Sequence, residues 1–330
     1  MIIKNVLKKK VFIIAEIGSN FDQNINKAFK LIDVAKESGA DAVKFQLFRA
    51  EELYPKSSSA YKIFKSIELQ KNWIPQLIKY AKKRKIIFFA SAFDKKSILT
   101  LIKLKVQILK IASSEITKLH NLSYAASFDI PLIISTGMAN LTDITEAVDL
   151  CRNIGNNNIY LLHTSSLYPT LPSDVNMKHM TKLGKIFDLP VGFSDHTMSS
   201  VAAIAAVALN AKIIEKHITL DKNSSGPDHF YAVEPNEFRK YVRDIREAEK
   251  ILGKKSIVIN PKVKVQARRK SIFVSKNVNK NEIITKKNLI IMDNARGIET
   301  RYMMSLLGFK FNNKIKKNSP LDWKYINFKK

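Results

Sequence analysis

The chain has 330 residues, 45% of them hydrophobic, a composition that suits a packed globular protein and excludes intrinsic disorder. Its single cysteine, Cys151, excludes a disulfide framework and a cysteine zinc cluster. Lysine and arginine total 56 against 29 acidic residues, and the formal charge of +27 attracts anions, but the lysines are scattered with little aromatic interleaving, which favours a solvated surface over a nucleic-acid site.

The first ten residues carry charge on both sides of a short apolar stretch and lack the apolar core of a signal peptide. No later stretch approaches the ~18 uncharged apolar residues that a membrane-spanning helix needs. The sequence therefore predicts a cytoplasmic protein with no membrane partner.

From Val11 onward, short apolar runs rich in β-branched residues alternate with longer segments of helical periodicity. Eight of these runs are predicted as strands, at residues 11–16, 42–46, 86–90, 108–112, 131–135, 159–163, 190–194 and 212–217. Residues 25–38 are typical of the intervening helices, because their apolar side chains lie largely on one face and Gly39 follows them. Eight strand–helix units predict a (β/α)8 TIM barrel over residues 1–253.

A polar and basic stretch follows the predicted barrel, and we interpret residues 254–269 as a linker. Residues 270–330 contain short strand-like pieces at 271–278, 282–292 and 313–321. They predict a compact β-rich domain that gains stability by docking on the barrel or on a partner subunit.

The active site of such a barrel forms where the strands end. Lysine ammonium and serine hydroxyl groups complement phosphate and carboxylate oxygens, so polar residues at these positions indicate a site for a small phosphate-bearing anion. Lys44 and Lys110 are notable because a barrel interior tolerates an uncompensated charge poorly, although a lysine in a strand can also extend to the rim. The residues expected at the strand ends are Glu16, Lys44, Gln46, Ser91, Lys110, Ser113, Ser135, His163, Tyr168, Ser194, Asp195, His196, Glu215 and His217.

His196 and His217 stand at the ends of the last two strands, close enough for both imidazoles to meet one divalent ion with oxygen ligands completing its shell. A structural role for the two histidines stays open. Asp228, in the loop after the eighth strand, belongs either to a turn before the final barrel helix or to a surface that accepts hydrogen bonds from sugar hydroxyls.

Eight segments of the chain, in the same order, resemble those of the sialic acid synthase family. They are AEIGSN (15–20), GADAVKFQ (39–46), LKIASSE (109–115), ISTGM (134–138), LLHTSSLYPT (161–170), GFSDHT (192–197), IEKHITLDK (214–222) and GPDH (226–229). The resemblance implies a metal-dependent barrel followed by a small SAF (antifreeze-like, β-clip) domain, and an enzyme that condenses phosphoenolpyruvate with an N-acylated mannosamine-type sugar and water.

The resemblance also implies roles for particular residues. Glu16, Lys44, Lys110 and Glu215 would be catalytic, and His196 and His217 would hold Mn²⁺ or Mg²⁺. The residues around phosphoenolpyruvate would be Lys44, Ser91, Lys110, Ser113, Ser135 and Ser194. The sugar would meet Gln46, Tyr168 and Asp228, together with Arg296 from the C-terminal domain of a domain-swapped homodimer.

Two segments depart from the family pattern. The family commonly has Asn-His-Asn-Gly after the first motif, where this chain reads Asn20-Phe21-Asp22-Gln23. The arginine that the C-terminal domain usually supplies lies in an Arg-Pro-Gly-like turn, whereas here the turn reads DNARGIET (293–300), and Arg296 is the nearest candidate.

Several alternatives stay open at this point. The acceptor can be the di-N-acetylated sugar of a legionaminate or pseudaminate synthase, and a keto-deoxy sugar acid synthase or an aldolase is a related barrel enzyme. A non-catalytic barrel with a ligand-binding SAF domain, and a basic nucleic-acid binder, are hypotheses from other classes. The joint presence of Lys44, His196 and His217 argues against a loss of catalysis.

Overall fold

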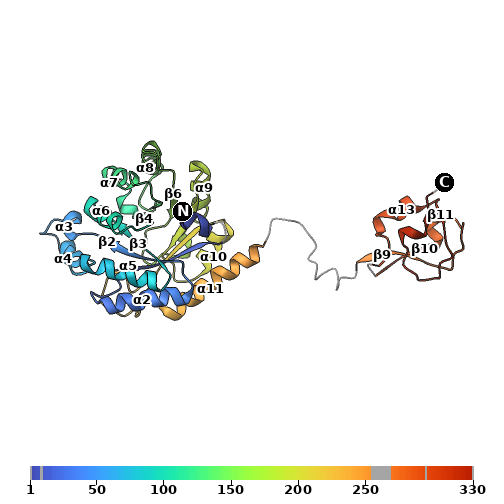
Figure 1. Cartoon of the computed structure of the whole chain (residues 1–330), viewed down its shortest axis with the longest axis horizontal. Coiled ribbons are helices and arrows are strands. Elements are labelled where there is room, and N and C mark those ends of the chain that lie inside the picture. The colour runs from blue at the N-terminus through green and yellow to red at the C-terminus, as the bar shows by residue number, and fades with distance from the viewer. Residues whose placement is uncertain (1, 8–9, 254–268, 294–295, 329–330) are drawn as a thin grey trace. The chain divides into compact units, whose positions relative to one another are not determined.

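The computed structural model describes residues 2–7, 10–253, 269–293 and 296–328, and the chain divides into two compact units, Met1–Gly253 and Lys254–Lys330 (Figure 1). The first unit has the bounds predicted for the barrel domain. The predicted linker, residues 254–269, lies outside the described residues except for Arg269. Within the described part of the chain, no helix combines the length and the apolar character needed to cross a bilayer.

The first unit is a closed barrel of eight strands, each parallel to its neighbours, in the order β1 to β8. The predicted (β/α)8 barrel is confirmed, and every strand lies within two residues of its expected position. The strands are β1 (Phe12–Gly18), β2 (Ala42–Leu47), β3 (Ile87–Ala92), β4 (Leu109–Ile111), β5 (Leu132–Ser135), β6 (Ile159–His163), β7 (Val191–Asp195) and β8 (Ile213–His217).

A ring of helices surrounds the strands (Figure 1). The first of them begins and ends as predicted, because the Asn24 side chain accepts hydrogen bonds from the backbone of Asn26 and Lys27, and Gly39 ends the helix with a φ of 90°. The helices that follow the strands are α2 (Ile25–Ser38), α5 (Ile74–Lys83), α6 (Lys95–Lys103), α7 (Leu119–Ala126), α8 (Leu141–Asn153), α9 (Lys178–Phe187), α10 (Val201–Ala208) and α11 (Pro235–Leu252).

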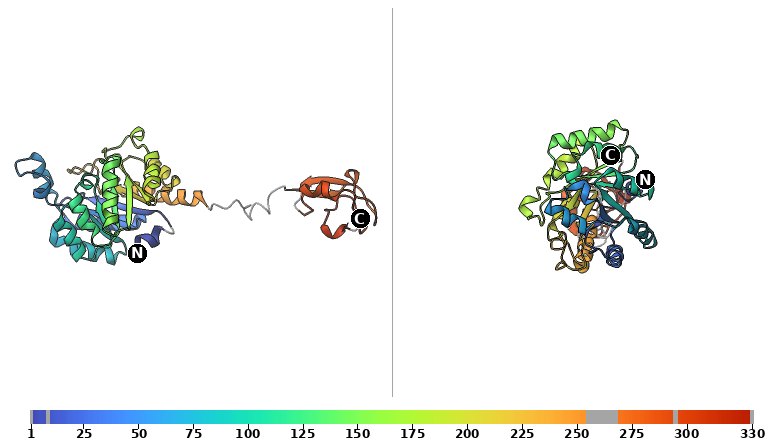
Figure 2. Two further views of the ribbon diagram at one scale, coloured as in Figure 1. Left: turned by 90° about the horizontal axis from the view of Figure 1, so that it is seen from above. Right: turned by 90° about the vertical axis from the view of Figure 1, so that its left-hand side faces the viewer.

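Short helical segments interrupt three of the loops at the carboxyl ends of the strands. The loop after β2 holds α3 (Ala50–Leu53), α4 (Ser59–Ser66) and a 3-10 turn at Lys71–Trp73. Helices α3 and α4 project from the edge of the barrel (Figure 2). Two further 3-10 turns, Ser113–Glu115 and Pro172–Asp174, follow β4 and β6.

The barrel interior is apolar towards the amino ends of its strands. This layer is continued by Ile3 of α1 (Ile2–Leu7), a helix that the sequence analysis did not predict. The apolar layer consists of Ile3, Phe12, Ile14, Ala42, Phe89, Ile108, Ile133, Tyr160, Leu162 and Ile213. A second and larger core fills the space between the strands and the surrounding helices. The charged side chains of the barrel are therefore confined to the carboxyl half of its interior.

The second unit is built from short strands around a core of its own. β9 (Lys270–Val274) pairs antiparallel with β10 (Leu289–Asp293), and β11 (Lys310–Phe311) pairs with β12 (Ile326–Asn327). The helical segments are α13 (Met303–Leu306) and the 3-10 turns Lys286–Asn288, Thr300–Tyr302 and Trp323–Tyr325. Residues 313–321, which were expected to be strand-like, form only isolated bridges at Ile315 and Pro320. Eleven buried apolar residues make the core.

Candidate active site

Glu16, Lys44 and Gln46 meet inside the barrel at the carboxyl ends of β1 and β2, where Glu16 pairs with Lys44 in register. Lys44 Nζ lies 2.9 Å from Glu16 Oε2 and donates a hydrogen bond to Ser91 Oγ at 3.1 Å. Gln46 Nε2 donates to Glu16 Oε1 at 3.0 Å. Burial raises the pKa of Glu16 to about 7 despite the neighbouring ammonium group, so this carboxyl group exchanges protons near neutral pH.

The two lysines differ in their partners. Burial lowers the pKa of Lys44, but Glu16 and Glu215 together raise it above its usual value. Lys110 Nζ donates to Ser135 Oγ at 2.6 Å and to the Ile111 carbonyl at 3.0 Å, and within the described residues it makes no ion pair shorter than 4.0 Å. Burial lowers the pKa of Lys110 to about 8. Lys110 is therefore a buried cation whose charge a bound anion would compensate.

His196, Ser194, Glu215 and His217 form a second group, at the ends of β7 and β8. The Ser194 hydroxyl donates to Glu215 Oε1 at 3.1 Å and lies 3.5 Å from His196 Nε2. The two imidazole rings are 5.5 Å apart, centroid to centroid. Glu215 Oε1 also lies 3.5 Å from Lys44 Nζ, so this group is continuous with the one on β1 and β2.

The two histidines fit a divalent metal. Burial lowers the pKa of His196 to about 3 and that of His217 well below its usual value, so both imidazoles are neutral and keep a lone pair for a metal. His217 Nδ1 and Glu215 Oε2 are buried without a hydrogen-bond partner in the described part of the chain. No cluster of three or more His, Cys, Asp or Glu side chains that could hold a metal occurs among the described residues, so water or substrate would supply oxygen ligands.

The loops after β4, β6 and β8 contribute the outer residues of the site. Ser113 Oγ lies 3.2 Å from Ser166 Oγ, and the Tyr168 ring lies 4.2 Å from the His196 ring. Asp228 Oδ1 accepts a hydrogen bond from the Tyr231 hydroxyl at 2.6 Å. The sequence analysis did not place Tyr231 in the site.

Asp228 approaches β1 closely at Gly18, where a larger residue would crowd its carboxylate. Gly18 has a φ of 55°, and a Cβ atom there would lie 3.0 Å from Asp228 Oδ2 and 3.3 Å from Gln46 Nε2. The predicted sugar-facing residues Gln46 and Asp228 are therefore brought together, beside Glu16.

Two residues expected at the strand ends do not face the site. His163 lies between β6 and α9, where its Nε2 is 2.6 Å from the Val175 carbonyl and its ring stacks on Phe193. Asp195 faces α11, and its Oδ2 accepts a hydrogen bond from the Tyr241 hydroxyl at 2.7 Å. Arg296 belongs to the second unit, between β10 and the turn Thr300–Tyr302, and its role stays a prediction.

A buried cluster on the outer side of β7 and β8 supports the histidine pair. Lys216 Nζ lies 3.7 Å from Asp195 Oδ2 and donates to the Thr197 carbonyl, while Asp195 Oδ1 accepts from the Thr197 amide at 2.8 Å. The amide and the carbonyl group of Thr197, the residue after His196, are thus both held by side chains on the outer side of the strands. The run Glu215-Lys216-His217 in a buried strand was a signal in the sequence that polar side chains lie on both faces of β8.

We expect Lys216→Met to lower the free energy of unfolding by about 3 to 5 kcal/mol, because it leaves Asp195 buried without its cation. Denaturant unfolding of the variant measures the loss. Asp195→Asn combined with Lys216→Met should recover part of it, since neither charge then remains buried. A single variant as stable as the wild type would contradict this account of the cluster.

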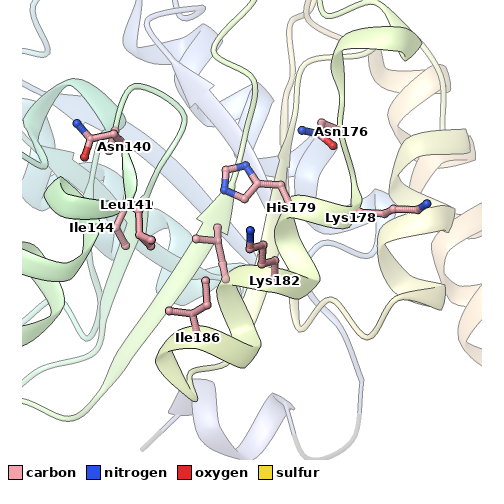
Figure 3. A pocket seen from close by; sticks show the side chains of 10 residues that line it. Asn140, Leu141, Ile144, Asn176, Lys178, His179, Lys182 and Ile186 are labelled. Carbon is pink, nitrogen blue, oxygen red and sulfur yellow. The ribbon is translucent and has the colours of Figure 1, made fainter.

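Other hollows lie away from these residues. One of about 400 Å³ is formed by the start of α8 and by α9, with Leu141, Ile186 and His179 in its lining (Figure 3). None of the residues predicted for the site lines it. The predicted site residues lie instead in the barrel interior, where the buried lysines, carboxylates and histidines converge.

These features define the first unit as a (β/α)8 barrel whose interior brings together buried lysines, carboxylates and a pair of histidines at the carboxyl ends of its strands. Residues 31–257 match the model of the NeuB family. The chain belongs to the NeuB family.

Relatives of known activity extend over nearly the whole chain. The chain is 38% identical to the N,N'-diacetyllegionaminic acid synthase of Legionella pneumophila, covering 96% of this chain and 94% of that protein. It is 33% identical to the pseudaminic acid synthase of Helicobacter pylori, over 94% and 96% of the two chains. The structure is similar to that of N-acetylneuraminic acid synthetase from Leptospira borgpetersenii, with a TM-score of 0.74, 34% identity, and coverage of 78% and 90%.

Proposed function

We propose that the chain is a sialic (nonulosonic) acid synthase that joins phosphoenolpyruvate, an N-acylated mannosamine-type sugar aldehyde and water into a nine-carbon 2-keto acid and phosphate. The observation that carries the proposal is the buried Lys110, which makes no ion pair shorter than 4.0 Å with any residue that the structure describes and shares the barrel interior with the Lys44–Ser91 pair. Two positive charges with serine hydroxyls beside them suit the phosphate and carboxylate of phosphoenolpyruvate.

The residues around the anion act by position and charge. Lys44, Lys110, Ser91, Ser135 and Ser194 are all buried, so their contacts with an anion form in a site that excludes water and are stronger than in solution. Ser113, half-buried in the turn after β4, extends the same set.

His196 and His217 would hold the metal, Mn²⁺ or Mg²⁺. When bound, such an ion supplies Lewis acidity that polarises the aldehyde group of the sugar. The structural requirement is that both imidazoles stay neutral, and their burial ensures it. The rings of Tyr168 and Tyr231 pack beside the two histidines, with centroids 6.4 and 5.0 Å from that of His217.

Bond formation joins C3 of phosphoenolpyruvate to the aldehyde carbon, whose oxygen would become a hydroxyl group by taking up the proton held by Glu16. The positive charge that develops at C2 is attacked by water, and the resulting tetrahedral intermediate expels phosphate by cleavage of the C–O bond, with its hydroxyl proton leaving on the phosphate as the ketone forms. Glu16 would accept the proton of that water, because its pKa of about 7 lets it both take up and return a proton near neutral pH. Glu215, whose pKa stays low because Lys44 and Lys110 outweigh the effect of its burial, would remain a charged partner.

The quaternary arrangement belongs to the same proposal. The homodimer with exchanged C-terminal domains, the SAF identity of the second unit and the contribution of Arg296 all stay predictions. The second unit has its own apolar core, which supports its treatment as a separate domain.

An acceptor panel tests the proposal. Phosphate release from phosphoenolpyruvate is measured with N-acetylmannosamine, with the di-N-acetylated legionaminate precursor and with the pseudaminate precursor. We expect the highest kcat/KM for the legionaminate precursor, since the identity to a legionaminate synthase, 38%, exceeds the 33% to a pseudaminate synthase. Phosphate release that requires none of these sugars, or release with a different aldehyde only, would direct the assignment to another barrel synthase or to an aldolase.

A further inference from the structure

The loop after β1 is strained at the position where the chain departs from the family pattern. Asp22 and Gln23 have φ values of 50° and 49°, in the left-handed region that favours glycine. Residues other than glycine are held in this region only when the surroundings compensate for the strain, and such positions gather at functional sites.

The compensation at Asp22 comes from the loop after β8, 207 residues away in sequence. Asp22 Oδ1 accepts a hydrogen bond from His229 Nε2 at 2.8 Å, and His229 Nδ1 lies 2.7 Å from Thr219 Oγ1. The His229 side chain is 2% exposed and the Asp22 side chain 23%, so this contact is partly shielded from water. A Cβ atom at Gly226 would lie 2.7 Å from the His229 ring, so the absence of a side chain at position 226 makes room for this ring.

The same loop carries the side chains that face the histidine pair. His229 is next to Asp228, which accepts the hydrogen bond of Tyr231, and the Tyr231 ring is 5.0 Å from His217. Asn20 adds two hydrogen bonds between the loops, from its Nδ2 to the carbonyls of Ile218 at 3.0 Å and Asp228 at 3.4 Å. These hydrogen bonds hold the β1 loop against the part of the β8 loop that carries Asp228 and Tyr231.

We propose that Asp22 and His229 form a latch between the loops after β1 and β8, and that this latch positions Asp228 and Tyr231 for the acceptor sugar. Both are positioning residues, because neither reaches the reacting groups. The inference rests on the proposed function, since it assigns the latch to the acceptor. Lys110 of the proposed anion site lies on β4 and donates to Ser135 on β5, whereas the latch joins the loops after β1 and β8, next to Glu16 and His217.

The test is Asp22→Gly, which removes the carboxylate while relieving the backbone strain, so a loss cannot be attributed to strain. We expect the KM for the acceptor sugar to rise about tenfold or more, as for the loss of a hydrogen bond to a charged group, with the KM for phosphoenolpyruvate changed by less than about twofold. Asp22→Asn, which keeps an acceptor oxygen, should restore most of the affinity.

Two matched controls remove neighbouring features and leave the latch intact. Gln23→Gly relieves the second left-handed residue, and Lys27→Met removes the cation that lies 2.6 Å from Asp22 Oδ2. Both should retain the wild-type KM for the acceptor. The latch proposal is wrong if either control raises the KM for the acceptor as much as Asp22→Gly does. It is also wrong if Asp22→Gly raises the KM values for the acceptor and for phosphoenolpyruvate equally.

Hydrogen exchange measured without substrates separates the latch from the proposed function. In Asp22→Gly, amides of residues 224–233 should exchange faster, while those of β1 and β8 keep their wild-type rates. Unchanged exchange in 224–233 would overturn the latch whatever the kinetics. Should the wild type be inactive with all three sugars, the proposed function and the assignment to the acceptor both fail, and the exchange rates alone then decide whether the contact holds the loops together.

Discussion

Replacing His196 and His217 together by alanine is expected to abolish metal binding and to lower phosphate release by at least about a hundredfold. The reason is that these are the two neutral imidazoles in the barrel interior, 5.5 Å apart, and that His217 Nδ1 has no hydrogen-bond partner within the described residues. Manganese titration followed by electron paramagnetic resonance measures binding directly, and a phosphate assay measures turnover.

His120→Ala is the matched control for this variant, because His120 is exposed on α7 and belongs to no part of the site. It should bind manganese as the wild type does. Chelation should silence the wild type, and added manganese should restore it. Full turnover of the double variant would refute the metal assignment, whereas lost turnover with intact manganese binding would move the metal to other ligands.

Lys110→Met should raise the KM for phosphoenolpyruvate about 10- to 100-fold, which corresponds to about 1.5 to 3 kcal/mol for a charge-assisted contact. The KM for the sugar should change little. Lys110 is the sharper test than Lys44, because the loss of Lys44 would also leave Glu16 and Glu215 without their cation.

The pH dependence of this KM has a predictable sign. Burial lowers the pKa of Lys110 to about 8, so in the free enzyme the ammonium group is present below that pH and is lost above it. An anion binds the charged form, hence the wild-type KM for phosphoenolpyruvate should rise as the pH passes 8, and this rise should be absent in Lys110→Met. Lys212→Met is the control and should keep the wild-type profile, because Lys212 is a half-buried residue just before the amino end of β8 whose ammonium group makes an exposed hydrogen bond to Asn210. If the KM for phosphoenolpyruvate still rises above pH 8 in Lys110→Met, the rise belongs to the titration of another group.

The positions of the strands were predictable because each strand is a short apolar run bounded by polar residues, and helix α2 because its apolar side chains lie largely on one face and Gly39 follows them. Which side chains point inward was not. Strands of a parallel barrel are buried on both faces, so they lack the alternation that would reveal the direction of a side chain. His163 and Asp195 were misplaced for this reason. In β6 the inward residues are Tyr160 and Leu162, which leaves His163 outside.

Contacts between distant loops were also beyond the sequence. The bond between Asp22 and His229 joins residues 207 positions apart, and no local pattern reports it. The sequence did mark the loop as unusual, because Asp22 and Gln23 stand where the family commonly has Asn and Gly. The structure supplies the physical meaning, namely two left-handed residues, of which Asp22 is held by a hydrogen bond from His229 in the neighbouring loop after β8.

The apolar layer that includes Ile3 fills the amino half of the barrel interior, so the proposed site opens at the carboxyl ends of the strands. Under the proposed function, both reactants would enter and both products would leave by this same end. Phosphate that stayed bound beside Lys110 would then occupy the place of the next phosphoenolpyruvate. We therefore expect product inhibition by phosphate, with its release contributing to the limit on turnover.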